Sequence, residues 1–122
     1  MIYLQRVYEP AAGSDGKRFL LERLWPRGVK KTALPMTAWL KEVAPSPPLR
    51  QWFNHDPAKW EEFRRRYRAE LAAQPAAWRT LLAATKAGSV TLLYGARDQE
   101  HNSARVLKQF LEEQISREKK SR

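Results

Sequence analysis

Four polar residues that could do chemistry follow directly after one apolar run. The run is residues 90–94, and Arg97, Asp98, His101 and Asn102 come next. A histidine exchanges a proton near neutral pH, an aspartate can orient its ring, and an arginine binds phosphate or carboxylate. Because ligands of α/β proteins bind where buried strands end, we predict a candidate site here. Its acid–base pair would be His101 with Asp98, and its ligand contacts would come from the other two residues.

A second polar group follows an earlier apolar run. Arg23 and Arg27 flank Trp25 and Pro26, and Gly28 follows. Proline removes a strand hydrogen bond and glycine permits a left-handed turn, so these residues predict a strand end and a shaped loop. The two arginines could clamp an anion. The alternative interpretation is that they are surface residues and that Trp25 anchors the core.

The chain has a second histidine, and it also lies beside an aspartate. His55 directly precedes Asp56, and His101 follows Asp98 by three residues. We include His55 among the candidate acid–base residues. The alternative is that both aspartates cap helices and both histidines bind local backbone groups. Although His and Asp are metal ligands, their spacing does not require a metal, and we predict neither a metal nor another cofactor.

The chain is strongly basic, with a formal net charge of +10 and an isoelectric point near 10.3. Such a charge attracts polyanions or simply keeps a protein soluble. Arg64, Arg65 and Arg68 lie in an arginine-rich run and could contact nucleic acid. Acidic residues one turn earlier favour a solvated helix face instead. Nucleic acid is therefore the alternative partner to a small anion.

Composition excludes several classes of protein. The chain has no cysteine, so it has no disulfide, thiolate zinc site or cysteine nucleophile. No apolar run is long enough to span a membrane and no signal peptide is recognisable, which predicts a cytoplasmic protein without a membrane partner. The oligomeric state is left open. The 122 residues suffice for one domain, expected over 1–115, followed by a charged, disordered tail over 116–122.

Periodicity and breaker residues predict an alternation of strands and helices. Thr37, Ser46, Asp56 and Asp98 are expected helix caps. The short link between the first two strands predicts that they are antiparallel. We expect strands at 2–8, about 19–24 and 90–94, and helices at 38–43, 47–53, 57–71, 76–87 and 99–115.

Three strings resemble the YeaO-like family, a bacterial domain of unknown function in the DUF 488 group. They are LERLWPRG, EVAPSPPLRQWFNHDPAKWEEFRRRYRAEL and VTLLYGARDQEHNSARVL. The resemblance implies a single small Rossmann-like α/β domain with a mostly parallel sheet of about three or four strands and about five helices, so that the first two strands are parallel. It adds Tyr94 to the motif, at a position where longer relatives have a cysteine. No established activity comes with the family.

Two functions follow from these observations. The leading hypothesis is a strand-end pocket that binds an anionic small molecule, a nucleotide or a phosphorylated metabolite. Arg23, Arg27 and Arg97 would hold the anion, with Trp25, Gly28, Tyr94 and Asn102 beside them. The alternative is a nucleic-acid-binding or regulatory module without catalysis. A protein–protein adaptor is a third, less specific option, and the sequence leaves enzyme or binding protein open.

Overall fold

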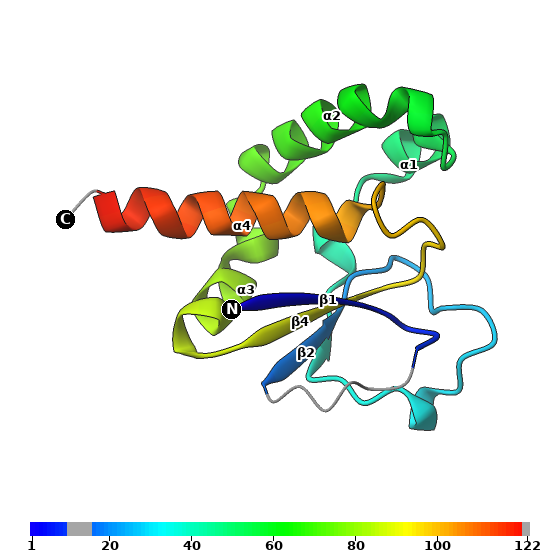
Figure 1. The fold of residues 1–122 in the computed structure, drawn as a ribbon, viewed down its shortest axis with the longest axis horizontal. Coiled ribbons are helices and arrows are strands. Elements are labelled where there is room, and N and C mark those ends of the chain that lie inside the picture. The colour runs from blue at the N-terminus through cyan, green and yellow to red at the C-terminus, as the bar shows by residue number, and fades with distance from the viewer. Residues whose placement is uncertain (10–15, 121–122) are drawn as a thin grey trace.

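A four-stranded parallel sheet forms the centre of the fold (Figure 1). The computed structural model describes residues 1–9 and 16–120. Each strand pair runs parallel, and the order across the sheet is β1-β4-β2-β3. The strands are β1 (Ile2–Arg6), β2 (Lys17–Leu20), β3 (Ala38–Trp39) and β4 (Val90–Tyr94). The predicted α/β class with a mostly parallel sheet is confirmed.

The central strand β4 lies between β1 and β2. All five of its residues are buried, as expected for an apolar run covered on both faces. Its Val90 pairs with Ile2 of β1, and its Leu92 pairs with Phe19 of β2. The antiparallel prediction for β1 and β2 was wrong, because it assumed that consecutive strands are neighbours. The parallel arrangement implied by the family resemblance is confirmed.

Four α-helices accompany the sheet in the described part of the chain, where about five were expected. The helix α1 begins at its predicted signal, where Ser46 accepts the Leu49 N–H at 3.3 Å. Asp56 accepts the Ala58 N–H at 3.0 Å and caps a 3-10 turn at Pro57–Lys59, so α2 begins at Trp60, three residues later than predicted. None of these helices has the length and apolar character needed to cross a membrane. They are α1 (Pro47–Phe53), α2 (Trp60–Ala73), α3 (Pro75–Ala87) and α4 (Ser103–Lys120).

The helix predicted at 38–43 does not form. Thr37 instead exchanges hydrogen bonds with Arg18: its N–H donates to the Arg18 carbonyl at 2.6 Å, and its hydroxyl accepts the Arg18 N–H at 3.0 Å. These contacts start the edge strand β3, which a 3-10 turn follows at Lys41–Val43. Pairing with β2 therefore overrides the local helical pattern.

The last helix begins later and ends later than predicted. Asn102, not Asp98, caps α4, because its side-chain oxygen accepts the Arg105 N–H at 3.0 Å. The helix continues to Lys120, so 116–120 is helical where a frayed tail was expected. Glu118 forms an ion pair with Lys86 of α3, which holds this end of the helix. Residues 121 and 122 of the predicted tail lie outside the described residues.

The two faces of the sheet are covered differently. One face carries the main core, which includes buried residues of all four helices, and α4 runs beside β1 and β4 with α2 on its outer side (Figure 1). The other face carries a small cluster in which Leu20 and Leu93 pack against Trp25, Val29 and other residues of the chain after β2. That connecting chain therefore covers one face of the sheet and leads past the carboxyl ends of the strands.

Candidate functional site

A cavity of about 690 Å³ lies at the carboxyl ends of β2 and β4. This is the edge of a parallel sheet where α/β proteins bind ligands, and the volume is within the range of small-molecule pockets, roughly 300–1,000 Å³. Most of its wall comes from the chain after β2, the chain after β4, and α1 with the turn that follows it, and Tyr8, Ala44, Pro45 and Phe63 complete the lining. The cavity therefore brings together residues that are far apart in the sequence.

One hydrogen bond joins the two strand ends. Gly95, just after β4, donates its N–H to Oε1 of Glu22, just after β2, at 2.7 Å. A Cβ at Gly95 would lie 3.3 Å from the same oxygen, so the missing side chain gives the carboxylate its room. The end of the 90–94 strand therefore lies beside the chain after β2, and Glu22, a residue that sequence reasoning did not select, joins the two.

Glu22 is a largely buried carboxyl group in the cavity wall. Burial raises its pKa, while the Gly95 N–H and the charges of Arg50 and His55 act in the opposite direction. Its second oxygen, Oε2, accepts no hydrogen bond from residues 1–9 or 16–120. Glu22 and Arg50 are the functional candidates that sequence reasoning missed. The available signal was a carboxylate directly after an apolar strand in the string LERLWPRG.

His101 and Asp98 form the predicted pair. The Nδ1 atom of His101 lies 2.9 Å from Oδ2 of Asp98, and the imidazole and the Trp60 ring pack in a T-shaped arrangement with centroids 5.1 Å apart. Asp98 also accepts the backbone N–H groups of Glu100 and His101, and these hydrogen bonds lower its pKa. The carboxylate therefore fixes the ring, an arrangement that suits proton exchange or ligand binding.

Asn102 has a structural role beside this pair. Its side chain is buried, its amide donates to the Asp98 carbonyl at 3.0 Å, and its oxygen caps α4. Both ends of the amide are thus occupied, although the residue lines the cavity. Asn102 ties the turn at Asp98 to the start of the helix.

His55 reaches the cavity from an unusual backbone conformation. Asn54 and His55 have φ values of 46° and 55°, the left-handed region that non-glycine residues rarely adopt. The turn ends α1 and places His55 in the cavity wall, with its ring centroid 6.4 Å from that of Phe53. Strained residues of this kind gather at functional sites.

Three arginines line the cavity with guanidinium groups that are not bonded to the described part of the chain. Arg27, Arg50 and Arg97 are exposed, and none of their side chains forms a hydrogen bond or ion pair with residues 1–9 or 16–120. Arg23 is different. Its guanidinium donates to the carbonyl groups of Ala44 and Pro45 at 3.1 and 3.0 Å, and it does not line the cavity.

The other predicted ligand contacts divide in the same way. Trp25 lines the cavity, while its Nε1 donates to the Val29 carbonyl at 2.6 Å. Gly28 has a left-handed φ of 79° and does not line the cavity. Tyr94 is buried and does not line the cavity either. Trp25 is thus the one member of these three that can touch a ligand in the cavity.

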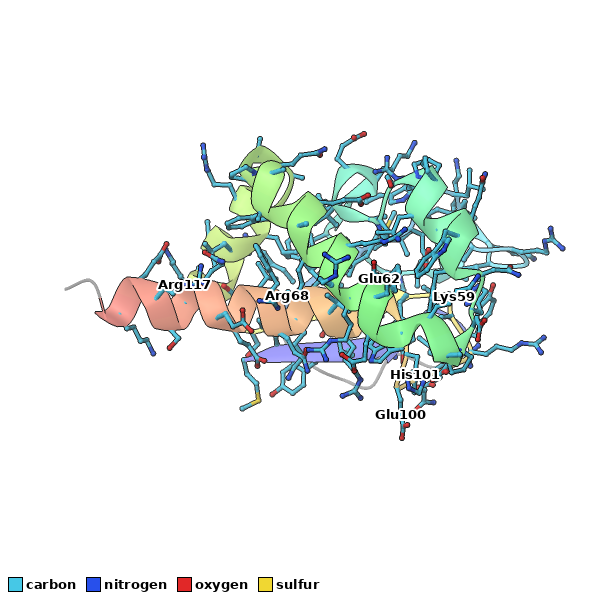
Figure 2. The ribbon with its side chains drawn as sticks, turned by 90° about the horizontal axis from the view of Figure 1, so that it is seen from above. Lys59, Glu62, Arg68, Glu100, His101 and Arg117 are labelled. Atoms are coloured by element: carbon cyan, nitrogen blue, oxygen red, sulfur yellow. The ribbon has the colours of Figure 1, made fainter. Side chains whose placement is uncertain are left out.

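The arginine-rich face of α2 is paired with carboxylates. Arg64 contacts Glu61 at 3.3 Å, Arg65 contacts Glu62 at 2.6 Å, and Arg68 pairs with Glu113 of α4. Hydrogen bonds from arginine lower the pKa of Glu62 to about 2. Arg68 also lies apart from His101, nearer to the C-terminal end of α4 (Figure 2). No group of three or more potential metal ligands occurs in the described ranges.

Comparison with known proteins identifies relatives over most of the chain. A family model described as the inactive DUF488-N3 subclade matches residues 1–122. The uncharacterized protein YeaO of Escherichia coli is 44% identical over 110 residues, which cover 90% of this chain and 96% of YeaO. The uncharacterized protein Rv3073c of Mycobacterium tuberculosis is 38% identical over 110 residues, covering 90% of this chain and 92% of that protein. No solved structure matches the chain.

Proposed function

The chain belongs to the DUF488-N3i family, and on that premise we propose that it binds an anionic small molecule, a nucleotide or a phosphorylated metabolite, in the cavity between β2 and β4. The role is binding without covalent catalysis. The family description, inactive, supports this choice. So does the absence of cysteine, which leaves the chain without a thiol nucleophile.

One observation carries the proposal. Arg27, Arg50 and Arg97 come from three different segments and line one cavity with no bonded partner in the described part of the chain. Guanidinium groups that converge on a concave site suit a phosphate or carboxylate, which each can bind with two parallel hydrogen bonds. Two cavity histidines, His55 and His101, add hydrogen-bond donors to the same anion site.

The alternative nucleic-acid role has weaker support. Arg64, Arg65 and Arg68 are each engaged by a glutamate, so a phosphate backbone would have to displace those carboxylates. Binding by such a face would weaken steeply with salt. Retention of the wild type and an Arg64/Arg65/Arg68 triple alanine variant on immobilised RNA and DNA separates the two roles. We expect equal retention.

Calorimetric titration with nucleoside monophosphates, sugar phosphates and sulfate tests the proposal. A hydrogen bond to a charged group contributes about 1.5–3 kcal/mol, so replacing Arg27, Arg50 or Arg97 with alanine should raise the Kd of a phosphorylated ligand about tenfold or more. Arg79→Ala is the matched control, because Arg79 is exposed on α3 and outside the cavity lining. The proposal fails if no phosphate ester binds more tightly than sulfate, or if the cavity variants bind like the control.

A further inference from the structure

Glu22 is a cavity residue to which anion binding assigns no role. Its Oε1 accepts the Gly95 N–H at 2.7 Å, and this bond closes the gap between the ends of β2 and β4. Glutamine would accept the same N–H through its amide oxygen without bringing a charge into a largely buried position. The structural bond therefore explains an acceptor at position 22 but not a carboxylate.

The other carboxylate oxygen is available to a ligand. Oε2 of Glu22 has no hydrogen-bond donor among residues 1–9 and 16–120, and Glu22 lines the cavity. A carboxylate in such a position recovers its lost hydration when a donor group binds it. The neighbouring charges of Arg50 and His55 act on Glu22 through space, without a hydrogen bond to it. The cavity thus presents one open acceptor together with three open guanidinium groups.

These groups set opposite requirements on one ligand. An anionic group that approached Glu22 would meet a like charge, whereas the guanidinium groups of Arg27, Arg50 and Arg97 attract it. The ligand must therefore keep its anion away from Glu22 and place an N–H or O–H donor there. A molecule with an anionic end and a donor end meets both requirements.

A large part of the remaining wall is apolar and partly aromatic. Trp25, Pro26, Phe53 and Phe63 line the cavity, as does Leu24, which is 71% exposed at this edge of the molecule. Such surfaces pack against flat rings. A donor-bearing ring joined to a phosphate is the chemistry of a nucleotide, whose base edge is read through hydrogen bonds.

We propose that the cavity selects a nucleoside monophosphate whose base presents N–H donors to Glu22. Guanine is the base of choice, because its ring N–H and its amino group stand side by side. One can donate to Oε2 of Glu22 and the other to the second lone pair of Oε1, whose first accepts the Gly95 N–H. The arginines hold the phosphate and the aromatic wall receives the ring. This inference rests on the proposed function and names its ligand class.

Titration of the wild-type chain with four probes tests the inference without a mutation. The probes are guanosine 5′-monophosphate, inosine 5′-monophosphate, ribose 5-phosphate and inorganic phosphate. We expect guanosine monophosphate to bind about tenfold or more tightly than ribose 5-phosphate. Inosine monophosphate, which lacks the amino group, should fall between them. Equal affinities for the three esters would overturn the inference.

A glutamine substitution tests Glu22 directly. Glu22→Gln keeps an acceptor for the Gly95 N–H and should weaken guanosine monophosphate about tenfold while leaving ribose 5-phosphate unchanged. Glu100→Gln is the matched control, since the Glu100 side chain is exposed and extends away from the body of the molecule (Figure 2). Circular dichroism and thermal unfolding establish that both variants fold. Unchanged guanosine monophosphate affinity in folded Glu22→Gln would overturn the inference.

The results separate this inference from the proposed function. If all three esters bind equally and Arg50→Ala weakens each of them, the anion pocket stands and base selection by Glu22 is overturned. If none of the four probes binds, both are overturned. Selective loss of the guanosine ester in Glu22→Gln supports both.

Discussion

The backbone strain at His55 gives a prediction with an unusual sign. Its φ of 55° lies in the left-handed region, which costs an L-residue roughly 1–2 kcal/mol. Glycine adopts this region freely, although its greater freedom in the unfolded chain offsets about 0.4–1 kcal/mol of the advantage. The His55→Gly variant should therefore be more stable than His55→Ala by about 0.5–1 kcal/mol.

The control is the same pair of substitutions at Gln51. That residue is exposed in the helix α1, where glycine is less favourable than alanine by about 1 kcal/mol. The order of the two variants should thus be reversed between positions 51 and 55. Urea unfolding followed by tryptophan fluorescence measures all four variants against the wild type. If alanine is as stable as glycine at position 55, His55 is not left-handed in solution and the reasoning fails.

The two His55 variants also test whether this residue binds the ligand. The alanine and glycine variants both remove the imidazole from the cavity, so they should weaken a bound anion equally while differing in stability. If His55→Gly is more stable than His55→Ala and both bind the anion more weakly than the wild type, the left-handed histidine serves binding at the expense of stability. Equal binding to wild type and both variants would remove His55 from the binding groups.

Three further predictions concern buried and capping groups. Tyr67→Phe should destabilise the protein by about 1–3 kcal/mol in urea unfolding, because the hydroxyl donates to the buried Val43 carbonyl at 2.5 Å. Burial raises the pKa of Glu22 above 4.5, so the folded state binds a proton more readily and stability falls as pH rises through and above this value. Glu22→Gln should accordingly gain more over the wild type at pH 7.5 than at pH 4, and a constant difference would contradict this. Asp98→Ala should cost about 1 kcal/mol of folding stability at pH 7, because the hydrogen bonds of the turn are lost. These hydrogen bonds lower the pKa of Asp98, so the stability difference between variant and wild type should vanish as pH falls well below 3.8. A difference that persists at pH 2 would contradict this.

Local signals predicted those elements that local contacts determine. Ser46 before Pro47 and Asp56 before Pro57 mark helix starts because each side chain accepts a backbone N–H within three residues. The 90–94 run was recognised as a buried strand because all of its side chains are covered. The pairing of Asp98 with His101 was likewise within reach, since only three residues separate them.

Features that depend on distant pairing could not be read in this way. The strand at Ala38–Trp39 exists because β2 offers it a hydrogen-bonding edge, and the local pattern alone favoured a helix. The sequence places a carboxylate after an apolar run, but Glu22 is tied to the 90–94 strand end only because β2 lies beside β4. Arg50 enters the cavity because the end of α1 is folded over the same strand ends.

The position of β4 in the sheet has a consequence for the order of assembly on the ribosome. β1 is made first, but its partner in the sheet is β4, and Ile2 pairs with Val90. Most of the chain must therefore be synthesised before the first strand can join the sheet. The cavity depends on the same late strand, because Gly95 supplies the bond to Glu22. A chain truncated before residue 90 should accordingly expose β1 to chaperones and lack any ligand site.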